Sequence, residues 1–264
     1  MTLEEMPVRI MFLNQSPLNP GATGRDTRVQ DLLRSYCSPG TELDLLYPDD
    51  FEGSRVMQAM GAQNILTGLH HAMATPTLIR KTVWAQDNGY DAVIQSNTFD
   101  PGVEPGRLAV RIPVIGVLRT TLHVASNLAD RIGITVPLAG HVPYTWRIIR
   151  SYGMQDFVTD IRAVGVYGEN MDQRKNELFE NAVKTMQGVI RDTSPACIIP
   201  LGGALIPYVV DPADLQREVG VPVLNTKAIG IAFAEMCVRN GMSHSPITYP
   251  SGNLKTEDFA ARVQ

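Results

Sequence analysis

The segment Val93–Gly102 (VIQSNTFDPG) decides how this chain is expected to fold. A short apolar run passes directly into Ser96-Asn97-Thr98, and a Pro-Gly break follows. A second segment, Ala196–Ala204 (ACIIPLGGA), again ends an apolar run in small residues. Short apolar runs that stop at turn residues are typical of buried strands in a parallel sheet. The two segments therefore predict two similar strand ends that border one shared site.

Further apolar runs of this kind alternate with helical patterns along the chain. The runs cover residues 8–13, 43–46, 92–95, 114–117, 132–136, 163–166, 197–201 and 221–224. The clearest helical pattern spans residues 171–191, where apolar side chains recur with the spacing of one helix face. Thr226 is expected to cap a helix over residues 228–238. Strands that alternate with helices predict an α/β protein with parallel sheets and right-handed crossovers.

An internal similarity divides this α/β fold into two halves. Residues 111–117 (RIPVIGV) resemble residues 220–226 (GVPVLNT), and each segment follows a strand-end turn at a similar distance. We therefore predict two pseudo-symmetric parallel-sheet domains, Rossmann-like or flavodoxin-like, with the active site in the cleft between them. The first domain is expected to comprise residues 1–119 and 227–264, and the second residues 120–226.

The composition excludes several classes of partner. The 264 residues are 44% apolar and 19% charged, with a net charge of −4 at pH 7. Nucleic-acid-binding proteins normally carry a basic patch, whereas Lys and Arg are scattered here, so no nucleic-acid partner is expected. No run approaches the roughly 20 apolar residues of a membrane span, and the acidic first residues do not resemble a signal peptide. We expect a cytoplasmic protein without a membrane partner.

The cysteines predict neither a disulfide framework nor a metal site. Cys37, Cys197 and Cys237 lie far apart in the sequence. No CxxC pair and no cluster of Cys and His with metal-ligand spacing is present. No metal ligand is therefore predicted.

The candidate site follows from where ligands bind in α/β sheets, at the carboxyl ends of the strands. This rule selects Asn14, Ser96, Asn97, Thr98, Arg119, Thr120, Thr135, Gly202, Gly203 and Ala204. Residues 96–98 could instead be a polar turn that caps the next helix. Residues 202–204 are expected to form a tight strand-to-helix turn, and the same turn could act as a nest of backbone amides for an anion. Arg119 either clamps a carboxylate or lies at the surface.

Histidine gives a weaker signal than these turns. His70 and His71 are expected on a helix among apolar residues. His141 and Tyr144 form the His/Tyr pair placed near the predicted cleft, although structural or solvent-facing roles also fit both. No Ser-His-Asp order and no nucleophile elbow is visible.

Taken together, these motifs resemble the aspartate/glutamate/hydantoin racemase superfamily, and hydantoin racemases in particular. Residues 93–98 resemble its first signature, a strand followed by Cys-Asn-Thr, and residues 100–103 resemble the Asp-Pro-Gly-Leu of hydantoin racemases. Residues 201–204 resemble the second signature, Leu-Gly-Cys followed by Ala or Thr. Residues 13–16 resemble the Asn-Pro-Asn-Thr segment after the first strand. The order of these motifs matches over nearly the whole chain.

The resemblance implies two pseudo-symmetric α/β domains, an active site between them and no cofactor. In this family two cysteines flank the stereocentre of the substrate. One removes the α-proton as a thiolate and the other returns a proton from the opposite face. The expected assembly is a homo-oligomer.

This chain departs from the family at both cysteine positions. The Cys-Asn-Thr match places the first position at Ser96, and the Asp-Pro-Gly match places it at Asn97. The second position falls on Gly203, and Cys197 lies several residues too early in its strand to substitute. Racemisation by two thiols is therefore not expected.

We expect a cofactor-independent enzyme of the isomerase or racemase class. Its substrate would be a small carboxylate or a hydantoin-like cyclic amide, and its intermediate an enolate-like anion stabilised by hydrogen-bond donors. One alternative is a cysteine-independent lyase or hydrolase, in which a bound water or the Tyr144/His141 pair moves the proton. Another is a catalytically silent protein that binds small molecules. Turnover distinguishes the enzymes from the binding protein, and solvent deuterium at the α-carbon distinguishes racemisation.

Overall fold

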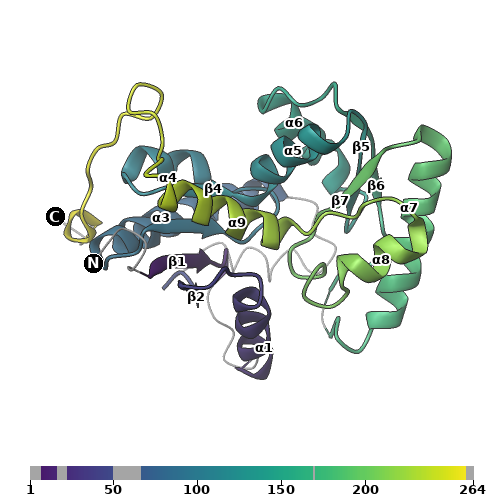
Figure 1. The fold of residues 1–264 in the computed structure, drawn as a ribbon, viewed down its shortest axis with the longest axis horizontal. Coiled ribbons are helices and arrows are strands. Elements are labelled where there is room, and N and C mark those ends of the chain that lie inside the picture. Colours follow the sequence, from purple (N-terminus) through teal and green to yellow (C-terminus); the bar gives the residue numbers. More distant parts are fainter. Residues whose placement is uncertain (1–6, 17–22, 50–66, 169, 260–264) are drawn as a thin grey trace.

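Two parallel sheets organise the molecule (Figure 1). The computed structural model describes residues 7–16, 23–49, 67–168 and 170–259. The first sheet has the order β2 (Thr41–Leu46), β1 (Val8–Leu13), β3 (Ala92–Gln95), β4 (Val114–Gly116). The second has the order β6 (Val158–Ala163), β5 (Ile132–Val136), β7 (Cys197–Pro200). Every strand pair is parallel. The predicted α/β fold with parallel sheets is confirmed.

The two sheets repeat one topology. The first strand of each half lies between the second and the third, so β5 corresponds to β1. Beside β7, Val223 forms a parallel bridge with Ile198, in the place that β4 takes beside β3. The resemblance between residues 111–117 and 220–226 therefore reflects equivalent positions in the two halves.

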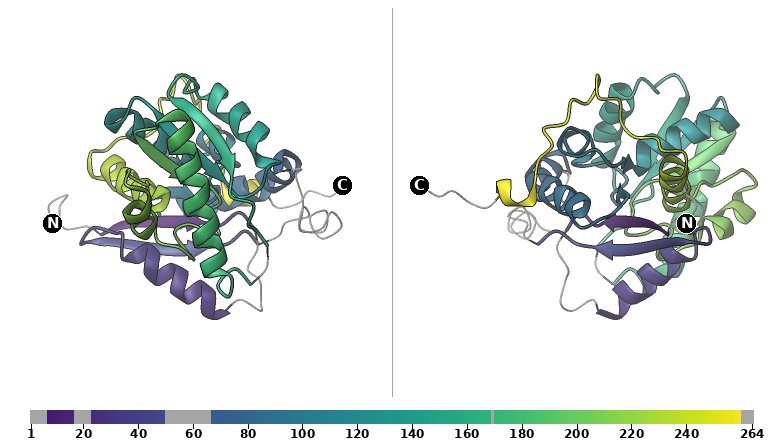
Figure 2. Two further views of the ribbon diagram at one scale, coloured as in Figure 1. Left: turned by 90° about the vertical axis from the view of Figure 1, so that its right-hand side faces the viewer. Right: turned by 60° about the vertical axis from the view of Figure 1, so that its left-hand side comes forward.

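Helices cover both faces of each sheet (Figures 1 and 2). Because side chains alternate along a strand, β1 directs Ile10 and Phe12 into the core that includes residues of α1 and α9, and Met11 and Leu13 into the core that includes residues of α3. The helices are α1 (Thr23–Arg34), α3 (Thr67–Asp87), α4 (Val103–Ala109), α5 (Val117–Leu128), α6 (His141–Ser151), α7 (Lys175–Thr193), α8 (Pro212–Val219) and α9 (Thr226–Arg239), with a 3₁₀ turn at Thr256–Phe259.

The helices α5 and α9 each cross to the other half. Although α5 follows β4 of the first sheet, it contributes Leu118 and Leu122 to the core of β5 and β7. In return, α9 contributes Ile231 and Ala234 to the core of β1 and β3. The two helices also contact each other. The domain boundaries expected from the sequence stay a prediction.

The cap of α9 differs from the prediction. Asn225, not Thr226, caps the helix, because its side-chain oxygen accepts from the N–H groups of Lys227 and Ala228, at 3.1 Å each. The helix therefore begins at Thr226, and the side chain of Asn225 holds its first turn in place. This position matters because the first turn of α9 lies at the carboxyl edge of the sheets.

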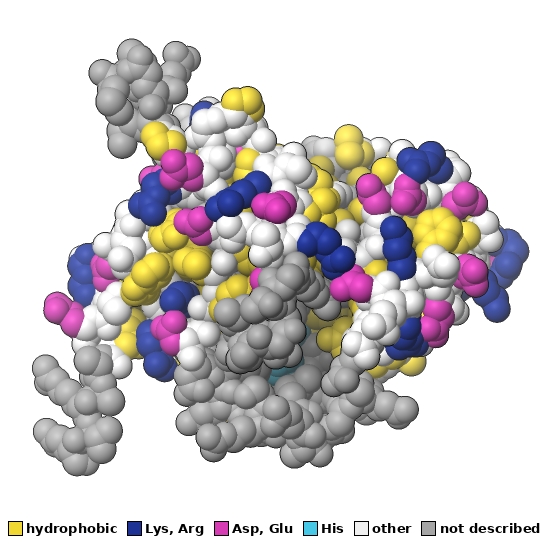
Figure 3. Space-filling model, turned by 90° about the horizontal axis from the view of Figure 1, so that it is seen from below, with side chains coloured by type: hydrophobic (Ala, Val, Ile, Leu, Met, Phe, Trp, Pro, Cys, Tyr) yellow, Lys and Arg dark blue, Asp and Glu magenta, His cyan; other side chains and the backbone are white. Residues whose placement is uncertain are grey.

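The outer surface carries charge of both signs. On the face in Figure 3, Lys and Arg side chains are interspersed with Asp and Glu side chains over both halves of the molecule. Within the part of the chain that the structure describes, no helix is both long and apolar enough to cross a membrane.

Candidate active site

The turn after β3 (residues 96–100) and the turn after β7 (residues 201–204) lie against each other. The backbone N–H of Gly202 donates to Oγ1 of Thr98 at 2.9 Å. Thr98 is fully buried, so this hydrogen bond is shielded from water. The structure thus brings the carboxyl ends of both sheets together. The Gly202 N–H and Oγ1 of Thr98 are therefore used in the hydrogen bond that joins the two turns.

The first turn is held in place by its own side chains. Oγ of Ser96 donates to Oδ1 of Asn14, 3.0 Å away, and the Asn97 carboxamide donates to Oε1 of Gln15. Oδ1 of Asn97 in turn accepts from the Phe99 N–H at 2.9 Å, which closes an Asx turn. Asn14, Ser96 and Asn97 therefore belong to one network that connects the ends of β1 and β3.

Asp100 ends this turn and binds the start of α5. Its buried carboxylate accepts from the N–H groups of Leu118 and Arg119, at 2.9 Å each, and from the Tyr152 hydroxyl at 3.0 Å. An anion at the start of α5 is favoured by the helix dipole. Burial raises the pKa of Asp100, and these hydrogen bonds oppose that effect. A Cβ on Gly116 would lie 2.5 Å from the Asp100 carboxyl carbon, which explains the glycine there.

Gly202 and Gly203 are glycines for different reasons. Gly202 has a φ of 100°, in the left-handed region, and a Cβ there would approach Cγ of Pro137 to 2.5 Å. Gly203 lies outside that region. Its constraint is space, because a Cβ would lie 2.6 Å from Nζ of Lys227 and 3.0 Å from the Ser96 carbonyl oxygen.

Lys227 is a site residue that the sequence did not reveal. Its side chain extends from the first turn of α9, is fully buried, and donates from Nζ to the carbonyl oxygen of Ser96. Nζ also lies 6.0 Å from the ring centroid of Phe12 and 5.7 Å from that of Tyr208. Burial lowers the pKa of Lys227 to about 7, although the negative charge of Asp100 acts in the opposite direction. Lysines are almost never fully buried, so a sequence pattern gives no reason to expect this one.

His141 and Tyr144 extend from α6 toward the first turn. Their rings lie 5.6 and 5.7 Å from the ring of Phe99. The Tyr144 hydroxyl is 2.9 Å from Nδ1 of His71, which comes from α3, while Nδ1 of His141 accepts from the Leu138 N–H. Tyr144 is thus bonded to His71 instead of His141. Burial lowers the pKa of His71 to about 3, so this imidazole is neutral at pH 7.

The remaining predicted residues lie around this junction with different partners. The Arg119 guanidinium donates to the Tyr249 hydroxyl at 3.5 Å and stacks over Tyr152 at 5.4 Å. Thr120 is buried on α5, and Ala204 is exposed beside Gly203. Thr135 is the next-to-last residue of β5, and its buried hydroxyl has no hydrogen-bond partner among the described residues.

The three thiols are poor nucleophiles. Burial raises the pKa of Cys37 and of Cys197 to about 11, and it raises the pKa of Cys237 as well. A thiol with such a pKa carries little thiolate at pH 7. Within residues 7–259, where the structure describes them, no three His, Cys, Asp or Glu side chains are arranged to hold a metal ion.

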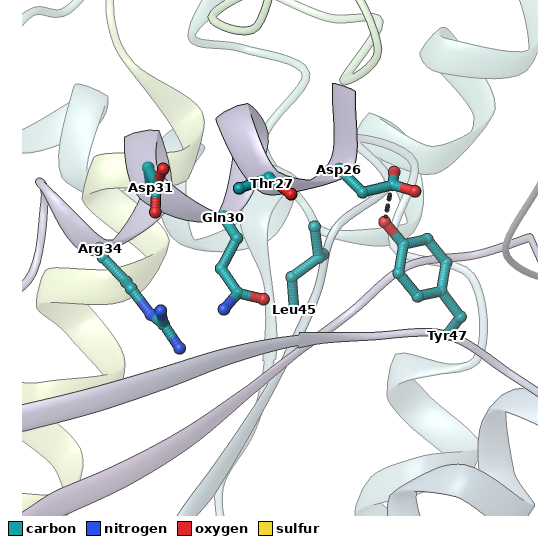
Figure 4. Close-up of a pocket in the computed structure, with 7 residues that line it drawn as sticks. All are labelled: Asp26, Thr27, Gln30, Asp31, Arg34, Leu45 and Tyr47. Atoms are coloured by element: carbon teal, nitrogen blue, oxygen red, sulfur yellow. Dashed lines mark hydrogen bonds between the residues drawn. The ribbon is translucent and has the colours of Figure 1, made fainter. Parts of the chain in front are cut away.

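A separate cavity of about 210 Å³ lies between α1 and β2 (Figure 4). Tyr47 and Asp26 close one side of it with a hydrogen bond of 2.7 Å. The cavity adjoins the edge strand of the first sheet, and its lining includes no residue of the two turns. Its lining residues are Asp26, Thr27, Gln30, Asp31, Arg34, Leu45 and Tyr47.

Comparison with known proteins places this geometry in a family. The model of the Asp/Glu/hydantoin racemase family matches residues 28–234. A hydantoin racemase from Pseudomonas sp. (strain NS671) is 28% identical over 235 residues, which cover 87% of this chain and 88% of that protein. A hydantoin racemase from Rhizobium meliloti is 24% identical over 189 residues, which cover 71% and 77%.

Solved structures agree with the fold. The allantoin racemase from Pseudomonas fluorescens matches with a TM-score of 0.78 at 22% identity, over 94% of this chain and 98% of that one. The allantoin racemase from Klebsiella pneumoniae matches with a TM-score of 0.76 at 18% identity, over 94% and 95%. With the family model matching most of its length, and as its motifs indicated, this chain belongs to the Asp/Glu/hydantoin racemase family.

Proposed function

We propose that this racemase-family enzyme binds a small hydantoin-like cyclic amide between the turns after β3 and β7, and inverts its stereocentre through an enolate-like anion. The observation that carries the proposal is the junction at Thr98 and Gly202, where the two turns that resemble the family's signatures meet. The relatives named hydantoin racemases cover most of the chain, which supports the same substrate class.

The side chains at the junction favour an amide ring over a carboxylate. Asn14, Ser96 and Asn97 offer hydroxyl and carboxamide groups, which match the N–H and C=O groups of a cyclic amide. The Arg119 guanidinium, the group best suited to a carboxylate, contacts Tyr249 and Tyr152 instead. A small carboxylate therefore remains the second substrate class to test.

The chemistry requires stabilisation of negative charge on an oxygen. When a proton leaves the carbon next to a ring carbonyl, the electron pair of that C–H bond moves onto the carbonyl oxygen. Donors positioned at this oxygen lower the barrier. Gly203 is partly exposed and its N–H has no acceptor among the described residues, so this N–H is the backbone donor that we assign to this role.

The test uses single enantiomers of 5-substituted hydantoins in deuterated water, with matching small chiral carboxylates in parallel. We expect optical activity to disappear and deuterium to appear at C5 of the hydantoin, faster than in the same solution without protein. Polarimetry and proton NMR measure the two rates.

Other outcomes contradict the proposal in distinct ways. Ring opening would indicate a hydrolase, and carbon dioxide release would indicate a lyase. Binding without exchange would indicate a protein that only binds small molecules. The cytoplasmic location, the homo-oligomeric state and the independence of a cofactor stay predictions.

A further inference from the structure

Lys227 occupies the space that a side chain at position 203 would need. Its Nζ donates to the Ser96 carbonyl oxygen of the first turn. It also lies 2.6 Å from where a Cβ of residue 203 would project from the second turn. One amine group therefore contacts both turns. By the motif resemblance, position 203 is also where the family's second cysteine is expected, so an ionisable group would be present at this place although the thiol is not.

The bonding of this amine is incomplete. A lysine ammonium has three N–H donors. Within the described part of the chain, the Ser96 carbonyl is the one hydrogen-bond acceptor that Nζ contacts, and the aromatic rings of Phe12 and Tyr208 flank it. A fully buried amine with unused donors is unfavourable unless another polar group meets it. A ligand bound at the junction would supply that group.

We propose that Lys227 is the catalytic base of this enzyme and replaces the thiol that the family carries at the second turn. The proposal rests on the proposed function, because it names the group that moves the proton of that substrate. The lone pair of the neutral Nζ takes the proton from C5, and the electrons of the C–H bond become the enolate. The ammonium formed faces the new negative charge and returns a proton, or a deuteron from solvent, to the carbon.

This step alone gives proton exchange on one face. Inversion requires that a second donor, either water or a group across the substrate, delivers the proton from the other face. Exchange at C5 is therefore the direct measure of what Lys227 does, and loss of optical activity measures both groups together.

The electrostatic surroundings suit a base. A general base works best when its pKa lies near the working pH, and burial brings the pKa of Lys227 to about 7. Asp100, behind the first turn, and Tyr208, after β7, are the titratable groups that contact or act on Nζ from neighbouring elements. The N–H groups of Leu118 and Arg119 and the Tyr152 hydroxyl hold the Asp100 carboxyl group in place by hydrogen bonds.

The first experiment replaces Lys227 with methionine, which keeps the apolar stem and removes Nζ. We expect C5 exchange in deuterated water to fall at least about 100-fold, the low end for a general base. Thermal unfolding should show a melting temperature no lower than that of the wild type, because a buried amine has been removed. Lys184→Met, on the exposed face of α7, is the matched control and should exchange at the wild-type rate.

The second experiment separates a base from a structural tie between α9 and the first turn. Lys227→Ala leaves room for a small primary amine, so ethylamine should restore exchange in proportion to its concentration. In the wild type, kcat/KM for exchange should rise with pH through about 7 and then level off, because only the neutral amine accepts a proton. A structural tie would give neither result.

The outcomes separate the two proposals. Wild-type protein that exchanges no hydantoin and no carboxylate overturns the proposed function, and the base with it. Wild-type exchange that persists in Lys227→Met overturns the assignment of Lys227 alone. Exchange that is lost in both variants, with lower melting temperatures and without rescue by ethylamine, makes Lys227 a positioning residue and also overturns its assignment as base.

Discussion

The turns after β3 and β7 hold equivalent places in the two sheets but are built in opposite ways. In the first, Ser96, Asn97 and Thr98 each bind a neighbouring segment through the side chain. In the second, Gly202 and Gly203 have no side chains, and Nζ of Lys227 lies where one at position 203 would project. A site that the fold makes symmetric is therefore chemically asymmetric, with hydrogen-bonding groups on one side and an ionisable group on the other.

The two crossing helices show the same divergence. Val117 begins α5 and Thr226 begins α9, so Leu118 and Lys227 are the second residues of equivalent helices. Both are fully buried. Leu118 packs in the core of the second sheet, whereas Lys227 reaches the junction between the turns. The fold can thus bury an apolar or an ionisable side chain at the same helical position.

The largest expected effect concerns the pH dependence of stability. The pKa of Lys227 is about 7 in the folded protein and about 10.4 in an unfolded chain. Between these values the unfolded state binds more protons, so stability increases with pH. We expect the wild type to gain about 3 kcal/mol relative to Lys227→Met between pH 6 and pH 9.

Urea unfolding of both proteins across this pH range measures that difference. Lys184→Met serves as the control, since an exposed lysine should follow the wild-type curve. If the stability difference between the wild type and Lys227→Met stays constant from pH 6 to pH 9, Nζ is solvated. The second turn would then have no buried ionisable group beside it, and the proposed asymmetry between the two turns would be wrong.

The next effect tests why position 203 is a glycine. Gly203→Ala places a Cβ against Nζ of Lys227, and overpacking of this kind costs about 2 kcal/mol. Methionine is shorter than lysine by one heavy atom, so Lys227→Met should recover about 1 kcal/mol of that loss as a coupling energy. Gly203→Cys, which introduces a thiol at the position where the resemblance implies one, should behave in the same way.

Gly202→Ala is the control for this cycle. Its cost comes from a positive φ and from Pro137, neither of which involves Lys227, so Lys227→Met should not relieve it. Chemical denaturation of the single and double variants measures both couplings. If Gly202→Ala and Gly203→Ala couple equally to Lys227→Met, contact with Lys227 is not the reason that position 203 is a glycine.

A smaller effect compares two buried threonines, one from each half. Thr98→Val removes the acceptor of the Gly202 N–H, and leaving that buried donor unpaired costs about 1–3 kcal/mol. Thr135→Val removes a buried hydroxyl without a partner in the described structure, so it should be neutral or stabilising by up to about 1 kcal/mol. Unfolding free energies that change in the same direction for both variants would contradict the role given to Thr98 as the link between the turns.

The sequence predicted the fold well because the strand signals are local. Apolar runs that stop at turn residues identified the strands, and the repeated order of motifs identified the two halves. The same signals brought Ser96–Thr98 and Gly202–Ala204 to one place, since the carboxyl ends of parallel strands share an edge. The structure places these segments in contact.

The chemistry of the site was harder to predict because it depends on contacts between distant segments. Lys227 follows a helix cap, where a lysine is normally solvated, and its burial depends on Gly203, Phe12 and Tyr208. The bond between Tyr144 and His71 joins α6 to α3, and no spacing in the sequence indicates it. Residue types alone suggested a pair between Tyr144 and His141, but the contact is decided by helix packing.

The smallest expected effect concerns the thiols, and it tests whether β7 contributes a hidden nucleophile to the glycine turn. Cys197 begins β7, the strand that leads into that turn, but burial raises its pKa to about 11. Because only the thiolate is alkylated, iodoacetamide at pH 7.5 should react slowly and leave exchange activity unchanged. Mass spectrometry of the treated protein, together with its exchange rate, measures both quantities. Rapid modification of a single cysteine that abolishes exchange, and that a bound hydantoin prevents, would return a thiol to the mechanism. The Cys197→Ser variant then decides whether β7 supplies it, since that variant should keep full activity if Lys227 is the base.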